Sequence, residues 1–302
     1  MNGNIREYAK LGLVHHMLYQ NCVNDPVYHA DTLARFASIS DIETFDFCVP
    51  YAEPWRSKAI DAVKHFSKES AYAMHLFPAR KISLGSIDLT ERELTKIIVR
   101  DQIEQAVKAG AMSFVFVSGA DIPEHRAEAQ EQFNEFCLWF CKELEPYGIT
   151  ALLEPFDRTV DKKFLYGPID ECVELVDRVG KIHNNIGIEL DIAHLPLMGE
   201  DIRESILKCG NRIQRVHLGN CVLKDKCCPL YGDMHPPIGI EGGEICEREL
   251  TIALKALLEI DYLDKSKRNP LVLEMRPIDG ENSIERTIAD SFALLDRAWA
   301  AM

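Results

Sequence analysis

The sequence has few positive charges and no long apolar stretch. Its 302 residues include 34 lysines and arginines against 48 aspartates and glutamates, which gives a net charge of −14. A surface that binds nucleic acid needs clustered lysine and arginine, and a membrane span needs about 20 consecutive apolar residues. We therefore expect neither a nucleic-acid partner nor a membrane partner.

Paired cysteine motifs are also absent. The ten cysteines are scattered along the chain and form no C-x-x-C pair. A disulfide framework usually shows regular spacing in a short secreted chain, and no signal-like segment is recognisable at the N-terminus. We expect reduced thiols and a cytoplasmic location.

No segment rich in proline, glycine and serine interrupts the chain, which favours one domain over residues 1–302. Short apolar runs alternate with longer segments of helical period, such as the segment in which Phe133, Cys137, Phe140 and Leu144 recur. The apolar runs are eight in number. They lie near residues 11–16, 44–49, 71–77, 113–118, 150–155, 186–191, 213–218 and 270–275.

The alternation predicts an α/β fold. Strands that alternate with helices imply right-handed crossovers and a parallel sheet, and eight such units close most simply into a barrel. An open doubly wound sheet is the alternative, but no G-x-G-x-x-G follows the first run. We predict a single (β/α)₈ TIM barrel with its active site at the C-terminal ends of the strands.

Four consecutive runs each end in or near a side chain that can bind a metal: Glu154, Asp191, His217 and Glu274. Taken alone, an acid at a strand end is more often a helix cap or an ion-pair partner than a metal ligand. Three carboxylates and an imidazole at one point would repel one another without a cation, and this donor set suits Mn²⁺, Mg²⁺, Co²⁺ or Zn²⁺. The pattern predicts one divalent metal ion.

The chain resembles the xylose-isomerase-like TIM barrels of the sugar phosphate isomerase/epimerase superfamily, particularly the D-tagatose/D-psicose 3-epimerases and related branches. The resemblance spans nearly the whole chain. It is most specific in the C-terminal half, where the motifs are L-E-P-F-D-R (153–158), L-D-I-A-H (190–194), V-H-L-G-N (216–220), G-D-M-H-P-P-I-G (232–239) and L-E-M-R-P (273–277).

The resemblance implies that Glu154, Asp191, His217 and Glu274 bind the metal, with Mn²⁺ as the expected ion and Co²⁺, Mg²⁺ or Zn²⁺ as alternatives. It also implies that Glu154 and Glu274 are the proton-transferring pair and that His194 binds substrate. The other residues expected at the substrate are Arg158, Asp233, His235, Arg276 and His75. Asp233 and His235 have two alternatives, a second metal site and a purely structural role in their loop.

The implied chemistry is sugar isomerisation or epimerisation. A glutamate removes a proton from a carbon next to a carbonyl, the metal stabilises the resulting enediolate, and the other glutamate returns a proton. Leu223 stands where the 3-epimerases carry an arginine, so a metal-dependent lyase acting on 3-oxo sugars, as in C-glycoside deglycosidases, is the alternative. A non-catalytic sugar-binding barrel is a third reading, which two opposed bases disfavour.

Two further expectations concern assembly and support of the site. The partner is a small sugar or sugar derivative, and the resemblance implies a homo-oligomer, with a small second subunit if the lyase reading holds. Glu189 and Arg215 each lie two residues before a predicted ligand, so both point into the barrel one layer lower. We predict that they form a buried ion pair beneath the metal.

Overall fold

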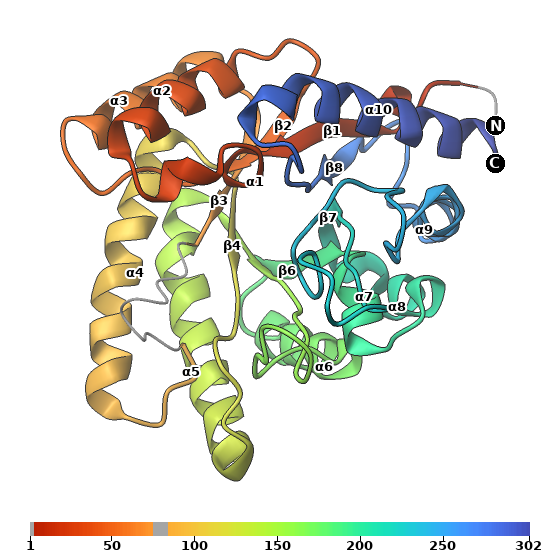
Figure 1. Cartoon of the computed structure of the whole chain (residues 1–302). Coiled ribbons are helices and arrows are strands. Elements are labelled where there is room, and N and C mark those ends of the chain that lie inside the picture. Colours follow the sequence, from red (N-terminus) through yellow and green to blue (C-terminus); the bar gives the residue numbers. More distant parts are fainter. Residues whose placement is uncertain (1–2, 75–83) are drawn as a thin grey trace.

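The computed structural model describes residues 3–74 and 84–302. Eight parallel strands form a closed barrel in chain order, and β8 pairs with β1 to complete it (Figure 1). The predicted (β/α)₈ barrel is therefore confirmed, and each predicted run overlaps a strand. The strands are β1 Ala9–Val14, β2 Thr44–Phe47, β3 Glu69–Ala73, β4 Ser113–Phe116, β5 Thr150–Leu153, β6 Ile186–Asp191, β7 Ile213–Leu218 and β8 Asn269–Leu273.

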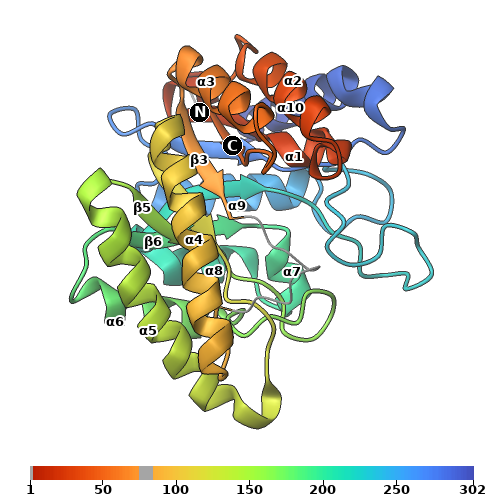
Figure 2. The same ribbon diagram turned by 90° about the vertical axis from the view of Figure 1, so that its left-hand side faces the viewer.

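Helices cover the outside of the barrel (Figure 2). The main helices are α2 Pro26–Ala37, α3 Trp55–Phe66, α4 Leu89–Ala109, α5 Arg126–Leu144, α6 Ile169–Gly180, α8 Ile202–Cys209, α9 Glu247–Glu259 and α10 Ile284–Ala300. The shorter α-helices are α1 His15–Leu18 and α7 His194–Met198. Single 3₁₀ turns are η1 Ile5–Glu7, η2 Gln20–Val23, η4 Pro123–His125, η5 Glu145–Tyr147, η6 Gly210–Arg212 and η7 Glu281–Ser283.

Local sequence sets several of the helix ends. The side chain of Asp88 caps α4 by accepting a hydrogen bond from the Glu91 amide, at 2.9 Å. The same helix ends at Gly110, whose φ of 76° lies in the left-handed region that glycine adopts without strain. Asp25 caps α2, and Pro26 occupies its first turn, where a missing amide proton costs nothing.

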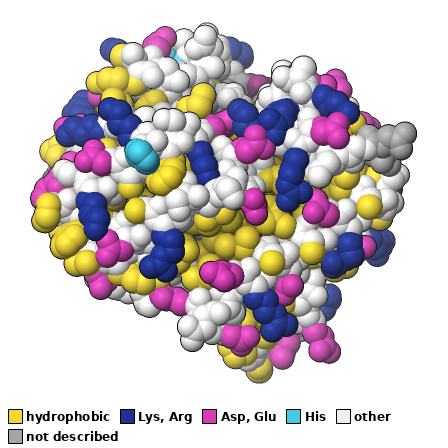
Figure 3. Space-filling view, turned by 90° about the horizontal axis from the view of Figure 1, so that it is seen from above, with side chains coloured by type: hydrophobic (Ala, Val, Ile, Leu, Met, Phe, Trp, Pro, Cys, Tyr) yellow, Lys and Arg dark blue, Asp and Glu magenta, His cyan; other side chains and the backbone are white. Residues whose placement is uncertain are grey.

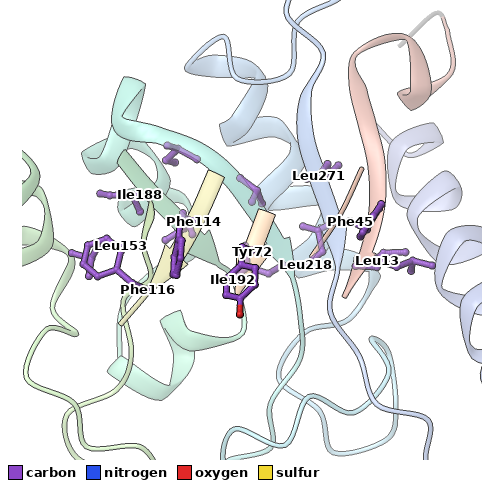
Figure 4. Close-up of a cluster of buried hydrophobic side chains, with 14 of the residues drawn as sticks. Leu13, Phe45, Tyr72, Phe114, Phe116, Leu153, Ile188, Ile192, Leu218 and Leu271 are labelled. Carbon is purple, nitrogen blue, oxygen red and sulfur yellow. The ribbon is translucent and has the colours of Figure 1, made fainter. Parts of the chain in front are cut away.

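Large apolar side chains pack between the barrel wall and the helices (Figure 4). Phe114 of β4 contacts Phe140 of α5, with ring centroids 5.0 Å apart. Tyr72 of β3 donates a hydrogen bond to Gln105 of α4 at 2.8 Å. These residues belong to the main hydrophobic core, which packs the helices against the strands.

The inside of the barrel is divided into an apolar side and a charged side. Ala71, Val115 and Leu152, on three neighbouring strands, form a small apolar cluster separate from the main core. On β2 and β7, by contrast, Asp46 and Arg215 are buried charged side chains. Branched apolar residues usually dominate the interior of this fold. Here buried charged side chains occupy part of it.

Acidic and basic side chains alternate over the face seen in Figure 3, and hydrophobic side chains gather in a hollow between them. None of the helices in residues 3–74 and 84–302 is long and apolar enough to cross a membrane. All ten cysteines are free thiols, as the sequence predicts.

Candidate metal centre and active site

The four predicted metal ligands lie at the carboxyl ends of four consecutive strands. Glu154 and Glu274 directly follow β5 and β8, Asp191 ends β6, and His217 is the penultimate residue of β7. One ligand atom from each lies within 4.8 Å of the others, and all four residues are buried. The fold thus brings together side chains that are up to 120 residues apart in the sequence.

The two carboxylate oxygens of Asp191 differ in their contacts, and Oδ2 lies 3.6 Å from both His194 Nε2 and His235 Nδ1. Oδ1 accepts hydrogen bonds from the backbone amides of Ala193, at 2.8 Å, and Gly219, at 3.2 Å. Oδ2 is buried and has no hydrogen-bond partner among the described residues. A buried carboxylate oxygen without a partner is costly, so this atom fits a position facing a cation.

The two glutamates of this site have pKa values shifted in opposite directions. Burial, together with Glu189 and Glu274, raises the pKa of Glu154 well above its usual value. Burial acts in the same direction on Glu274, but the imidazoles of His235 and His217 outweigh it and lower the pKa of Glu274. His217 Nδ1 lies 2.5 Å from Glu274 Oε2. Three carboxylates with one imidazole are a donor set that suits a divalent cation.

An ion cluster closes the barrel beneath His217. Arg215 donates from Nε to Asp46 Oδ1 at 2.9 Å and from Nη2 to Thr44 at 3.0 Å. Arg215 Nε also lies 3.5 Å from Glu189 Oε2, which confirms the predicted buried pair. Asp46 on β2 is nevertheless the closer partner, and the contact crosses the barrel because β2 and β7 are not neighbours in the sheet.

The same cluster faces the lower edge of the His217 ring. Nε2 lies 3.3 Å from Asp46 Oδ2 and 3.4 Å from Glu189 Oε2. A histidine that binds a metal through one nitrogen usually donates its other N–H to a carboxylate or carbonyl, which fixes the ring. This arrangement leaves Nδ1 of His217 on the side of Glu274 and the other candidate ligands.

A second group of polar side chains adjoins Asp191. His235 Nε2 and His194 Nε2 lie 2.8 and 3.3 Å from Asp233 Oδ1, and Lys162 Nζ lies 3.0 Å from Asp233 Oδ2. Asp191, His194 and His235 also have ligand atoms within 4.8 Å of one another. The chain therefore offers two overlapping donor sets that share Asp191, and the predicted single metal and its two-metal alternative both stay predictions.

A cavity of about 250 Å³ opens above these groups. Its polar lining includes Glu154, Glu274, Asp233 and His235. Its apolar lining includes Met17, Val23, Cys48, Met74, Val115, Val117 and Phe156. The cavity therefore offers both polar and apolar contacts to a small molecule.

The remaining predicted residues lie in different places. Arg276 lines the cavity, with Nε 3.3 Å from Met17 Sδ. Arg158 does not line it and instead forms two hydrogen bonds with Glu171, at 2.9 and 2.6 Å. His75 lies outside the described residues.

Besides its apolar residues, Cys48 and Glu189, the cavity is lined by three residues outside the predicted set of site residues: His16, Asp46 and Lys162. Asp46 alternates with Phe45 and Phe47, so strand period alone could have placed it inside the barrel. His16 follows the first strand and has a buried Nδ1 without a partner. Lys162 comes from a loop, and no periodic signal in the sequence indicates it.

The chain matches the xylose isomerase-like TIM barrel family over residues 34–297, and no curated protein sequence matches it. A D-tagatose 3-epimerase-like protein shares 17% identity and a TM-score of 0.71, covering 95% of this chain and 98% of that one. D-psicose 3-epimerase from Clostridium cellulolyticum H10 shares 18% identity over 96% and 95% of the two chains, with a TM-score of 0.65. The 3-keto-D-glucoside 4-epimerase from E. coli shares 10% identity over 94% and 99%, with a TM-score of 0.67.

At these identities the likeness to solved structures concerns the fold. The family match covers most of the chain, including all four candidate metal ligands. The chain belongs to the xylose isomerase-like TIM barrel family.

Proposed function

We propose that the protein is a divalent-metal-dependent sugar isomerase or epimerase. The observation that carries the proposal is the convergence of one buried ligand atom each from Glu154, Asp191, His217 and Glu274 within 4.8 Å. Bound there, a divalent ion would supply Lewis-acid polarisation of a carbonyl oxygen. Mn²⁺ is the proposed ion, with Co²⁺, Mg²⁺ and Zn²⁺ as alternatives.

Glu154 and Glu274 are proposed as the acid/base pair. They follow β5 and β8, which are not neighbours in the barrel, so they approach the same point from different sides. The pKa of Glu154 is raised and that of Glu274 is lowered, so one can hold a proton while the other is ionised. One removes a proton from the carbon next to a carbonyl, and the other returns a proton to the opposite face.

The other polar residues of the cavity are proposed to orient the substrate. His235 and Lys162 are both held by Asp233, which fixes their donor groups at the cavity wall. Arg276 offers guanidinium donors and has no carboxylate within 4.0 Å among the described residues. The similarity to proteins named as ketose and keto-glucoside epimerases supports a small sugar or sugar derivative as the substrate.

The second candidate function keeps the same metal site and bases but eliminates a substituent from a 3-oxo sugar. The apolar lining of the cavity favours it, because Met17, Val23 and Met74 could pack against an apolar leaving group. Removal of the proton from the carbon next to the 3-oxo group would expel the substituent on the adjoining carbon and leave a carbon–carbon double bond. The expelled substituent would take up a proton.

The first test is metal content. Protein stripped with a chelator and reloaded with Mn²⁺ is expected to bind one Mn²⁺ per chain, measured by elemental analysis after desalting. Glu274→Gln and His217→Ala should lose it, because each removes a donor from a four-residue site. Glu128→Gln, an exposed residue, is the matched control. A wild type that takes up no Mn²⁺, Co²⁺, Mg²⁺ or Zn²⁺ would contradict both candidate functions.

The second test separates the two candidates. In heavy water the Mn²⁺-loaded protein should exchange a proton for deuterium at the carbon next to the ketose carbonyl, detected by NMR. Glu154→Gln and Glu274→Gln should each slow this exchange by roughly 10²- to 10⁴-fold, the usual contribution of a general acid or base. Release of an aglycone from a 3-oxo glycoside, without exchange into ketoses, would favour the lyase instead.

A further inference from the structure

One cationic side chain of the cavity has no acidic partner. Among the described residues that line the cavity, Lys162 and Arg276 are the lysine and the arginine. Lys162 Nζ lies 3.0 Å from Asp233 Oδ2 and 3.4 Å from Asp161 Oδ2, so its charge is neutralised. The guanidinium of Arg276 has no carboxylate within 4.0 Å in the described part of the chain. A guanidinium is always charged, and this charge is left for a ligand.

The backbone and one edge of Arg276 are held in place. Its amide donates a hydrogen bond to the His235 carbonyl at 2.7 Å, and Pro277 follows, which favours an extended backbone at Arg276. Its Nε donates to Met17 Sδ at 3.3 Å, and a thioether is only a weak acceptor. Neither Nη1 nor Nη2 makes a hydrogen bond with the described residues. The end of the guanidinium is therefore open to a two-pronged contact.

His16 lies beside this guanidinium. It follows β1 and Arg276 follows β8, and these two strands pair in the barrel. Burial lowers the pKa of His16, and the charge of Arg276 acts in the same direction, whereas Glu274 and Asp46 act in the opposite one. The two side chains are thus close enough to interact. Because an imidazole can donate a hydrogen bond, His16 adds a second donor at this end of the cavity.

These two donors suit a carboxylate. The planar fork of an arginine matches a carboxylate with two parallel hydrogen bonds. Sugar hydroxyls do not require an uncompensated charge, and Glu274, Asp233 and His235 already offer them partners in the same cavity. A phosphate has more oxygens to satisfy and often uses backbone amides at a helix N-terminus. A single fork beside one imidazole fits the smaller anion better.

We propose that the substrate is a keto sugar acid and that Arg276, assisted by His16, binds its carboxylate while its carbonyl group lies between Glu154 and Glu274. The inference rests on the proposed function for the chemistry at the carbonyl. It makes Arg276 the residue that separates acidic from neutral sugars, because a neutral sugar leaves the guanidinium without a partner.

Three ligands that differ at one carbon test this proposal. D-fructuronate is D-fructose with its C6 hydroxymethyl group replaced by a carboxylate, and D-fructose 6-phosphate carries a phosphate there. Isothermal titration calorimetry on Mn²⁺-loaded, full-length protein should give a dissociation constant roughly tenfold or more lower for D-fructuronate than for D-fructose, the usual size of a charged hydrogen bond. D-fructose 6-phosphate should bind less tightly than D-fructuronate.

Variants assign the preference to its residues. Arg276→Gln should abolish it, and Arg276→Lys, which keeps the charge but not the fork, should retain only part of it. His16→Phe keeps a ring of similar shape without an N–H and should weaken D-fructuronate binding by roughly three- to tenfold. Arg286→Gln, which alters an exposed arginine on α10, is the control and should keep the full preference.

The proposal is overturned if wild type binds D-fructuronate and D-fructose equally, if the preference survives Arg276→Gln, if His16→Phe binds D-fructuronate as tightly as wild type, or if D-fructose 6-phosphate binds more tightly. Deuterium exchange tests the reaction separately. A wild type that exchanges protons of D-fructose without preferring D-fructuronate keeps the proposed function and loses this inference. One that prefers D-fructuronate through Arg276 but exchanges none of its protons supports the carboxylate contact and contradicts the proposed function.

Discussion

The carboxylate of Asp191 depends on a glycine. Its Oδ1 accepts from the Gly219 amide, and a Cβ at residue 219 would lie 2.9 Å from both carboxylate oxygens and 2.8 Å from His235 Nδ1. A side chain of any size would therefore push Asp191 or His235 out of position. Residue 219 must therefore be glycine because a side chain would collide with Asp191 and His235, and not because its backbone needs a left-handed conformation.

Gly219→Ala tests this dependence. We expect it to weaken Mn²⁺ binding about tenfold or more, the size of effect seen when the support of a metal ligand is disturbed, measured by competition with a fluorescent chelator. Gly180→Ala is the control, because a Cβ at residue 180 meets no atom within 4 Å. Equal affinity in the two variants would show that Asp191 adapts freely.

His29 should make the metal-free protein sensitive to acid. Its pKa is about 4 in the fold and about 6.5 in an unfolded chain. Above pH 6.5 His29 is neutral in both the folded and the unfolded chain, so it does not change the free energy of unfolding. Between pH 6.5 and 4 only the unfolded chain takes up the proton, so stability falls as pH falls, by roughly 3 kcal/mol in total.

The measurement is the free energy of unfolding in urea at several pH values, with a chelator present. His29→Gln should flatten the slope between pH 6.5 and 4, since glutamine does not titrate. His125→Gln, which alters an exposed histidine before α5, should leave the slope unchanged. If the slopes of wild type and His29→Gln agree, His29 takes up its proton inside the fold.

Strands β2 and β7 are joined through the barrel by Asp46 and Arg215, both 1% exposed. Removing one partner of a buried ion pair leaves an uncompensated charge, which typically costs 3–5 kcal/mol. We expect Asp46→Asn to lower the free energy of unfolding by about 3 kcal/mol. This is the lower end of that range, because Glu189 also lies near the guanidinium of Arg215. Urea unfolding of metal-free protein measures the loss.

The double variant Asp46→Asn/Arg215→Met distinguishes an ion pair from simple packing. It should lose less stability than the sum of its two single variants, because no charge remains without its partner. The exposed pair Arg178 and Glu131 supplies the control, and Glu131→Gln should cost less than about 1 kcal/mol. Strict additivity at Asp46 and Arg215 would contradict a direct coupling.

The sequence predicts those strands and helices in which apolar residues recur at a regular spacing. Each strand was located from its apolar run, and strand ends then placed Glu154, Asp191, His217 and Glu274 at one rim of the barrel. What could not be predicted are contacts between elements that are not neighbours. Asp46 meets Arg215 across the barrel, and Lys162 reaches Asp233 from a loop.

The exact ends of the strands are also not predictable from the apolar runs. The third strand begins at Glu69, two residues before its predicted run, because the polar residues Glu69 and Ser70 pair with β2 without interrupting the sheet. Backbone pairing does not require apolar side chains at a strand's N-terminal end.

Arg158 is expected at the substrate by resemblance, yet its guanidinium is held by Glu171 on α6.

The whole molecule should be more stable with metal than without it. The four candidate ligands bring buried negative charge to one point, and an ion that binds only the folded chain adds stability by mass action. At a free Mn²⁺ concentration 1,000 times the dissociation constant, the gain is about 4 kcal/mol. We expect the unfolding midpoint to rise by several degrees on Mn²⁺ addition and to fall on chelation.

Calorimetry with and without a chelator measures this difference. Glu274→Gln should respond less to Mn²⁺ than the wild type, since it lacks one donor, while Glu128→Gln should respond fully. A stabilisation by Mn²⁺ that is the same in Glu274→Gln would place the ion elsewhere in the molecule.

The bridge between Asp46 and Arg215 also bears on how such a barrel can diverge. Either residue, if changed first, leaves a buried charge behind, so a lineage that drifts one position at a time must pass through a weakened intermediate. Surface pairs impose no such barrier and can be exchanged freely. We therefore expect relatives of this protein to keep both residues or to have replaced both, and seldom to carry one without the other.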